Sequence, residues 1–180
     1  ETLTASAVDT DLGGKGANQA LAAARAGAQV TLIGCVGNDA HGDAYLAHLQ
    51  SEHIDTRWIR RSPGPTGTAH ILVEDSGENC IVVHPGANHA LTSANVRDAV
   101  TAIEAADALL VQLECPLPVV LEALALAHHA GVRTLLNPSP ITGAFIQAMP
   151  AVDTLLVNAL EASLLSGVPM ADLEAAGKSL

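Results

Sequence analysis

The sequence predicts an α/β fold, a three-layer α/β/α domain with a mostly parallel sheet and a small β-hairpin that projects from it. Short apolar, β-branched segments alternate with Ala- and Leu-rich segments of helical length, as in βαβ units. The apolar segments are nearly continuous, as expected of strands covered by helices on both faces. A further pair of apolar segments within residues 66–84 flanks a polar, glycine-containing loop at 75–79 and predicts an antiparallel hairpin.

In the first half of the chain, a glycine-rich stretch precedes the first helix. This helix ends at Gly27, because glycine is the usual residue just past a helix C-terminus. In order, we expect a helix at 17–26, a strand at 29–36, a helix at 43–50, a strand at 56–61 and hairpin strands at 68–73 and 80–84.

The second half repeats the strand–helix alternation more regularly. Thr92 or Ser93 can cap its first helix, and Gly131 follows its second. We expect a helix at 96–106, a strand at 108–113, a helix at 118–130, a strand at 132–136, and a strand at 154–157 that leads into a short helix.

Composition excludes several classes of function. The 180 residues are 49% apolar and contain 8 Lys and Arg against 19 Asp and Glu, a net charge of −11, which disfavours binding to nucleic acid or to anionic membranes. The one basic cluster is Arg57, Arg60 and Arg61, interpreted as a solvated strand edge. No apolar run reaches the roughly 18 residues of a membrane span, and no signal peptide is visible. The three cysteines form no C-x-x-C pair, which favours reduced thiols in a cytoplasmic protein.

Polar residues follow three of the predicted strands. They are Glu114, Asn137 and Asn158, and Glu161 comes one helical turn after Asn158. Ligands of α/β sheets bind beyond the carboxyl ends of strands. Each residue alone is also an ordinary helix cap or first-turn residue, but three at one edge of a sheet favour a binding site.

The strongest local signal is the string Gly-Gly-Lys-Gly-Ala-Asn-Gln at residues 13–19. Glycines at a helix start let the backbone approach a ligand closely, and the first N–H groups of the helix point toward it. Lys15 adds a positive charge, and Asn18 adds a donor and an acceptor suited to sugar hydroxyls. The spacing matches neither a Walker A loop nor a dinucleotide-binding fingerprint.

Together with Ala20, this string resembles the signature of the ribokinase-like family of carbohydrate kinases. The resemblance continues in order along essentially the whole chain, at residues 34–39, 77–79, 84–88, 112–114, 136–140 and 158–161.

The resemblance implies specific roles for residues of this chain. Glu114 would hydrogen-bond sugar hydroxyls, Asn158 would contact the nucleotide, and Glu161 would help to order Mg²⁺ near the phosphates. The hairpin would form part of a lid over the sugar and a homodimer contact. The sugar-binding segment would comprise Gly14, Lys15, Gly16, Ala17 and Asn18.

The implied activity is transfer of the ATP γ-phosphate to D-ribose, giving D-ribose 5-phosphate, with Mg²⁺ bound with ATP and K⁺ as a monovalent cation. The Lys-Gly-Ala variant at residues 15–17 is the main ground for choosing ribose. The alternatives are a family member that acts on another sugar or on a nucleoside, and a non-catalytic sugar-binding domain that has lost the kinase half.

Part of the family pattern lies outside these residues. The Gly-Ala-Gly-Asp type motif with the catalytic Asp is absent, and the K⁺ site and the later nucleotide loops belong to the same missing C-terminal part. The first strand, with an Asp that touches the sugar, would precede Glu1. We therefore expect an incomplete domain that binds sugar weakly and does not turn over by itself. Flanking sequence containing both features would decide for a kinase over a binding domain.

Overall fold

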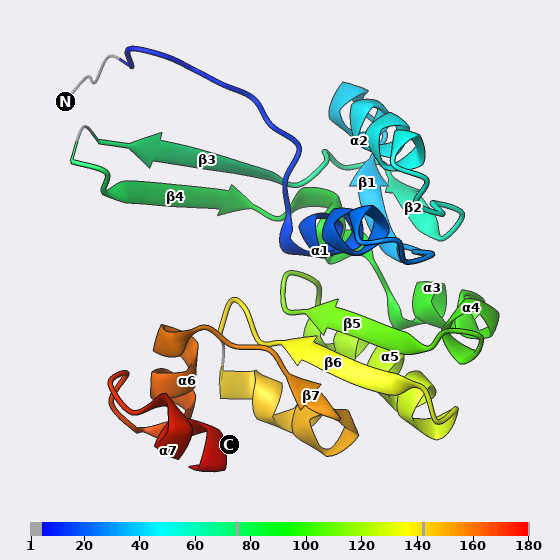
Figure 1. The fold of residues 1–180 in the computed structure, drawn as a ribbon. Helices are drawn as coiled ribbons and strands as arrows, with labels where there is room; N and C mark the ends of the chain where they lie inside the picture. Colours follow the sequence, from blue (N-terminus) through cyan, green and yellow to red (C-terminus); the bar gives the residue numbers. More distant parts are fainter. Residues whose placement is uncertain (1–4, 75, 142, 180) are drawn as a thin grey trace.

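The computed structural model describes residues 5–74, 76–141 and 143–179 (Figure 1). Its β structure forms three small sheets: β1 (Gly34–Gly37) with β2 (Ile59–Ser62), β3 (Thr68–Val73) with β4 (Asn79–His84), and β5 (Ala108–Gln112), β6 (Arg133–Asn137) and β7 (Thr154–Leu155) in that order. The helices are α1 (Lys15–Arg25), α2 (Ala40–Ser51), α3 (Ser93–Asp98), α4 (Val100–Glu104), α5 (Leu117–His129), α6 (Ala159–Ser166) and α7 (Leu173–Ser179), with 3₁₀ turns η1 (Gly86–Ala90) and η2 (Gly143–Ala151).

Strand pairing agrees with the predicted mostly parallel arrangement. β1 pairs with β2 in parallel, as do β5 with β6 and β6 with β7. The hairpin is antiparallel, with Thr68 opposite His84 and Val73 opposite Asn79. Gly77 turns the chain with φ of 86°, a conformation that glycine adopts without strain; Asp75 of the predicted loop lies outside the described residues.

The strands predicted at 29–36 and 56–61 are shorter in the structure than the sequence suggested. Val30 and Leu32 exchange backbone hydrogen bonds with Asp55, but only Thr31 and Asp55 form a bridge there. The chain after Asp55 turns, since the N–H of Ile59 donates to the carbonyl of Thr56. This turn interrupts the pairing, so regular strands begin only at β1 and β2.

Two further boundaries differ from the prediction. The helix predicted at 96–106 is split into α3 and α4 at Ala99, whose φ of −93° and ψ of 9° leave the helical region. The strand predicted at 154–157 ends at Leu155. There the side-chain amide of Asn137 donates to the carbonyl of Leu156 at 2.9 Å, in place of a strand partner.

The helix ends follow the glycines that the sequence offers. Gly27, Gly131 and Gly167 have φ of 95°, 73° and 71°, and each lies within two residues of the end of a helix. At the N-terminus of α2, Asp39 is the N-cap, and its carboxylate accepts the N–H of Gly42. This cap starts α2 at Ala40 rather than at the predicted residue 43.

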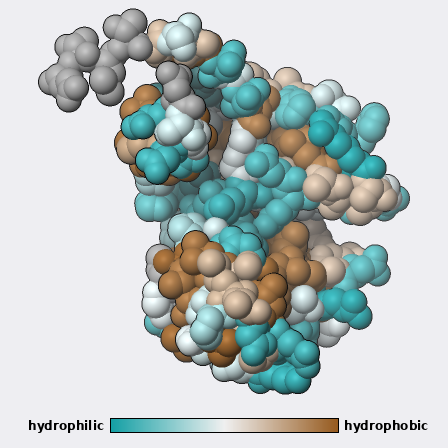
Figure 2. All heavy atoms as spheres, turned by 60° about the vertical axis from the view of Figure 1, so that its left-hand side comes forward, coloured by the Kyte–Doolittle hydropathy of each residue, from teal (hydrophilic) through white to brown (hydrophobic). Residues whose placement is uncertain are grey.

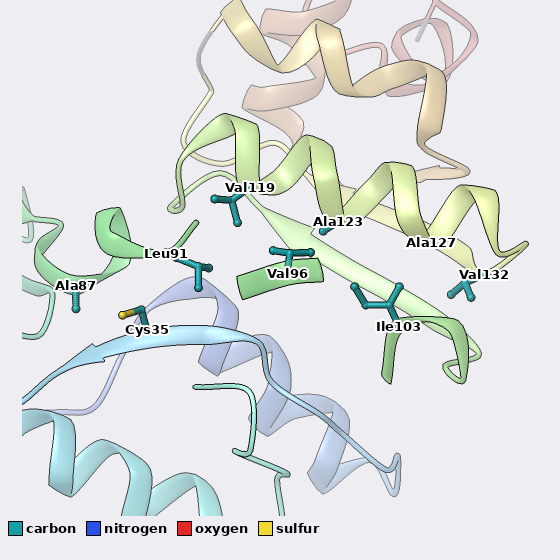
Figure 3. Packing of buried hydrophobic residues seen from close by; sticks show 9 residues of the cluster. All are labelled: Cys35, Ala87, Leu91, Val96, Ile103, Val119, Ala123, Ala127 and Val132. Carbon is teal, nitrogen blue, oxygen red and sulfur yellow. The ribbon is translucent and has the colours of Figure 1, made fainter. Parts of the chain in front are cut away.

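A shared core joins the β1–β2 sheet to the β5–β7 sheet. Cys35 of β1 and Leu91 pack against Val96 of α3, and Val96 packs against Val119 and Ala123 of α5 (Figure 3). Burial of such apolar side chains contributes about 1.5–3 kcal/mol for each large one. The core therefore fixes the β1–β2 layer relative to the β5–β7 sheet.

Most of the exposed large apolar side chains in the described residues gather in two regions. One is the hairpin. The other covers η2, α6 and α7, and lies in the lower half of Figure 2; it includes Ile146, Leu160, Leu164, Met170 and Leu173. None of the helices that the structure describes is long and apolar enough to cross a bilayer.

Candidate active site

The start of α1 lies against the end of β5. Gly14 caps α1 with φ of 94°, a conformation that L side chains rarely adopt, and provides no side chain as a cap. Glu114, two residues past β5, supplies the missing acceptor: its Oε2 takes the N–H of Lys15 at 2.8 Å. A carboxylate at a helix N-terminus is favoured by the helix dipole. The contact joins two predicted sugar-binding residues that are 99 positions apart in the chain.

Two residues that the sequence analysis did not assign support this contact. The N–H of Glu114 donates to Oε1 of Gln112, and a Cβ on Gly16 would lie 3.0 Å from Nε2 of the same glutamine. The hydroxyl of Tyr45 donates to the carbonyl of Gly13. Burial of the phenol is the larger cause, and the nearby Glu114 carboxylate the smaller one, that raise the pKa of Tyr45 to about 12. The Tyr45 hydroxyl therefore remains a neutral donor. Tyr45 is the only tyrosine in the sequence, and this was the one feature that could have drawn attention to it.

The other predicted sugar-binding residues lie along α1. Asn18 is exposed, one turn after Gly14, and its backbone N–H donates to the carbonyl of Gly14 at 2.9 Å. Ala17 is only 7% exposed and packs with Leu49 and Ile54 in the core. The side chain of Ala17 therefore faces the protein interior, and only its backbone is available to a ligand.

A groove of about 400 Å³ lies beside Lys15 at the ends of β6 and β7. It brings Lys15 together with the nucleotide- and metal-binding residues that the sequence predicted, Asn158 and Glu161. The remaining lining residues are Asn137, Ser139, Leu156 and Val157. Asn137 also accepts a hydrogen bond from Nε2 of Gln19 on α1 at 3.5 Å, which ties α1 to this edge of the sheet.

Asn158 and Glu161 form a reciprocal cap at the start of α6. Oδ1 of Asn158 accepts the N–H of Glu161 at 2.8 Å, and Oε2 of Glu161 accepts the N–H of Asn158 at 2.9 Å. Such a capping box stabilises the helix start by about 1 kcal/mol. The start of α6 thus lines the groove beside Lys15, and the positive end of the helix dipole there suits phosphate.

Other chemistry receives little support from the described residues. Burial is the larger cause, and the neighbouring Glu114 carboxylate the smaller one, that raise the pKa of the Cys115 thiol to about 11. Cys115 is therefore not a thiolate nucleophile. Residues 5–74, 76–141 and 143–179 contain no group of three or more His, Cys, Asp or Glu that could hold a metal ion. Each arginine of the basic cluster is paired with a carboxylate: Arg57 with Asp55, Arg60 with Asp98 and Arg61 with Asp43.

Comparison with known proteins identifies the family. The model of the pfkB family of carbohydrate kinases matches residues 1–180. The chain belongs to the pfkB family. Within it, the ribokinase of Haemophilus influenzae is 42% identical over 180 residues, covering 99% of this chain and 59% of that protein. The ribokinase of Mus musculus is 38% identical over 169 residues, covering 93% of this chain and 52% of that protein.

A solved structure of a family member shows the same fold. The ribokinase of Arabidopsis thaliana, complexed with ribose and ATP, superposes with a TM-score of 0.90 at 28% identity, covering 99% of this chain and 60% of that one. This likeness confirms the predicted ribokinase-like three-layer α/β/α fold. The chain spans just over half the length of these relatives.

Proposed function

We propose that the protein containing this chain is an ATP-dependent sugar kinase that phosphorylates D-ribose to D-ribose 5-phosphate. The observation that carries the proposal is the position of Lys15. Its backbone N–H binds Glu114, the predicted sugar ligand, while the residue lines the same groove as Asn158 and Glu161. A sugar hydroxyl and a phosphate chain can therefore meet at one point, which phosphoryl transfer requires.

The sugar half of the site is built from α1 and the residue after β5. One carboxylate oxygen of Glu114 accepts the N–H of Lys15, and we propose that the other accepts sugar hydroxyls. Asn18 lies one turn along α1 and offers a donor and an acceptor. Gly14 and Gly16 let α1 start close to the other side chains of the site, since a Cβ on Gly14 would lie 3.5 Å from the hydroxyl of Tyr45 and one on Gly16 would lie 3.0 Å from Nε2 of Gln112.

The phosphate half consists of the start of α6 and Lys15. We propose that Asn158 contacts the nucleotide and that Lys15 and the N–H groups of α6 offset phosphate charge. Mg²⁺ usually keeps several waters and takes one or two carboxylates together with substrate phosphates. The single carboxylate of Glu161 at this groove fits that pattern. When bound with ATP, Mg²⁺ would neutralise charge on the phosphates.

The proton acceptor for the sugar hydroxyl has no candidate in these residues, because they contain no Gly-Ala-Gly-Asp type motif. We place the general base in the remaining length that the relatives have. Nothing in the described residues assigns a site to K⁺, and no step is derived through it. A cytoplasmic location, as expected from the three reduced cysteines, stays part of the proposal.

The choice of ribose is supported by the relatives. Ribokinases of Haemophilus influenzae and Mus musculus are 38–42% identical to this chain, whereas the deoxyribokinase of Salmonella typhi is 32% identical. The ribokinase of similar fold from Arabidopsis thaliana was complexed with ribose and ATP.

The test is ADP release by the complete protein with D-ribose, 2-deoxy-D-ribose, D-fructose or adenosine as acceptor. We expect kcat/KM for D-ribose to exceed that for 2-deoxy-D-ribose by about tenfold or more, since a site built to bind a hydroxyl rejects an analogue that lacks it. D-Fructose and adenosine, which differ from ribose in size and shape, should also be poorer acceptors. A higher kcat/KM for another acceptor would make that compound, and not ribose, the proposed substrate. Ribose binding without ADP release would instead favour the non-catalytic sugar-binding domain.

We further propose that the β3–β4 hairpin is a lid over the sugar and the contact of a homodimer. One of its faces carries a continuous set of apolar side chains that are more than half exposed: Ile71 57%, Val73 67%, Ile81 53% and Val83 64%. Ile71 and Ile81 lie directly opposite each other across the two strands. An apolar face of this kind is unusual on a monomer surface and suits an isologous contact with a second copy.

A charge in this face should separate the subunits. We expect the complete protein to be a dimer at micromolar concentration and Ile71→Lys to be a monomer, because two lysines would meet in a desolvated contact. Sedimentation equilibrium measures both. Arg25→Lys, on the far end of α1, is the control and should remain a dimer. A monomeric wild type, or a dimeric Ile71→Lys, would contradict the proposed contact.

A further inference from the structure

A single carboxylate joins the start of α2 to the segment before the hairpin. Oδ1 of Asp39 accepts the N–H of Gly42 at 2.8 Å and the hydroxyl of Thr66 at 2.6 Å, and Oδ2 accepts the N–H of Thr66 at 2.8 Å. The hydrogen bonds from Thr66 and then Gly42 lower the pKa of Asp39 to about 2. Capping α2 uses only one of these three bonds, so the other two hold a residue 27 positions away.

Thr66 is held from the other side as well. Its hydroxyl oxygen accepts the N–H of Gly37, the last residue of β1, at 2.9 Å. The backbones approach so closely that a Cβ on Gly37 would lie 2.3 Å from the amide nitrogen of Thr66. A Cβ on Gly42 would likewise lie 2.3 Å from the carbonyl oxygen of Gly37. We call Gly37, Asp39, Gly42 and Thr66 the Asp39 knot.

The two ends of the hairpin are tied to each other next to this knot. The carbonyl of Pro65, before β3, accepts the N–H of Ala87, after β4, at 2.8 Å. Gly86 has φ of 50°, and a Cβ there would lie 2.5 Å from the oxygen of Pro65. A Cβ on Gly67 would lie 2.7 Å from the oxygen of Pro85. The knot therefore fixes both ends at once.

Beyond its two ends, the hairpin makes little contact with the rest of the protein. Every residue of β4 is exposed, and so is every residue of β3 except Thr68. The hairpin projects on the side of the molecule to which the arrows of β5 and β6 point, where Glu114 and the groove lie (Figure 1). Its direction is therefore set at its base and not by packing along its length.

We propose that Asp39 is the positioning residue that fixes the direction of the β3–β4 hairpin, acting through Thr66. The six-residue strands are about 20 Å long, so a tilt of roughly 10° at the base moves the tip by about 3.5 Å. A shift of that size would open a lid over the sugar. The kinetic consequence rests on the proposed function, whereas the structural consequence does not.

Two pairs of variants separate this role from a simple loss of stability. Thr66→Val removes the hydroxyl that donates to Asp39 and accepts from Gly37, and Thr66→Ser keeps it. Asp39→Asn keeps the size of the side chain but removes its charge. Thr92→Val is the control: it removes a comparable N-cap hydrogen bond, in the capping box of Thr92 with Asn95 at α3, away from the hairpin.

Hydrogen–deuterium exchange of the complete protein without ligands tests the structural part. Thr66→Val and Asp39→Asn should exchange about tenfold faster at residues 66–67 and 86–88, because each variant loses a charge-assisted hydrogen bond. The bonds between β3 and β4 should stay protected, because the hairpin itself is intact. Thr66→Ser and Thr92→Val should exchange as the wild type does there. Unchanged exchange at the hairpin base in Thr66→Val, or the same increase in Thr92→Val, would overturn the proposal.

Steady-state kinetics test the consequence for the lid. Thr66→Val should raise KM for ribose about tenfold, while KM for ATP changes less than about twofold. Thr66→Ser, which keeps the hydroxyl, should have the wild-type KM for ribose. An equal KM for ribose in Thr66→Val and wild type would contradict the claim that the direction of the hairpin affects ribose binding. A wild type that phosphorylates no ribose would defeat the proposed function and leave the exchange result to decide the role of Asp39.

Discussion

Glu114→Gln should lower kcat/KM for D-ribose by about 10²-fold. A hydrogen bond to a charged group contributes about 1.5–3 kcal/mol, and 1.4 kcal/mol corresponds to a factor of ten. Glutamine keeps an oxygen for the N–H of Lys15, which Glu114 accepts at 2.8 Å, so α1 should start as before. What is lost is the charge of the carboxylate that we propose accepts the sugar hydroxyls.

The effect of Glu114→Gln should be confined to the sugar. KM for ATP should change less than about threefold, because Asn158 and Glu161 line the groove on the other side of Lys15. Glu122→Gln is the matched control, since Glu122 is an acidic residue of α5 paired with Arg97 and not with α1. Steady-state kinetics with each substrate varied in turn measure both variants. Equal losses in Glu114→Gln and Glu122→Gln would remove Glu114 from the sugar site.

Gly37→Ala should destabilise the protein by about 3 kcal/mol, the upper end of the cost of overpacking. The added Cβ would lie 2.3 Å from the amide nitrogen of Thr66 and 2.7 Å from the carbonyl oxygen of Gly64. Both are backbone atoms, which cannot rotate away as a flexible side chain would. Relief therefore requires β1 to separate from the segment that leads into the hairpin.

Gly34→Ala, three residues earlier in the same strand, is the control for Gly37→Ala. No atom lies within 4 Å of a Cβ built on Gly34, and its φ is not positive. We expect its free energy of unfolding to stay within about 0.5 kcal/mol of the wild type. Urea unfolding of the complete protein measures both variants. A Gly37→Ala variant as stable as Gly34→Ala would show that the two backbones are not in contact there.

Local features of the fold could be predicted from the sequence because local residues cause them. Gly27 and Gly131 follow helix ends, where only glycine adopts a positive φ without strain. The alternation of apolar segments around Gly77 predicted the hairpin, and the structure has it with its strands in register. The strands before Glu114 and Asn158 were predicted in the same way, from short apolar runs followed by polar residues, although β7 ends two residues earlier than predicted.

Contacts between distant parts of the chain could not be predicted in this way. The bond between Glu114 and the N–H of Lys15 and that between Asp39 and Thr66 depend on how the layers pack. No periodicity or propensity records such a distance. Tyr45 is an example among side chains, since its helix position gives no sign that its hydroxyl reaches the carbonyl of Gly13. The role of the glycine-rich string came from its resemblance to a family, not from its spacing.

The identity of the phosphorylated carbon tests the central claim most directly. The complete protein is incubated with ATP, Mg²⁺ and carbon-13-labelled D-ribose, and the product is observed by NMR. We predict a single product in which phosphorus couples to C5 of ribose, as transfer to the 5-hydroxyl requires. Coupling to C1, or unchanged ribose beside intact ATP, would contradict a site in which Glu114, Lys15 and Asn158 bring the sugar and the phosphate chain together.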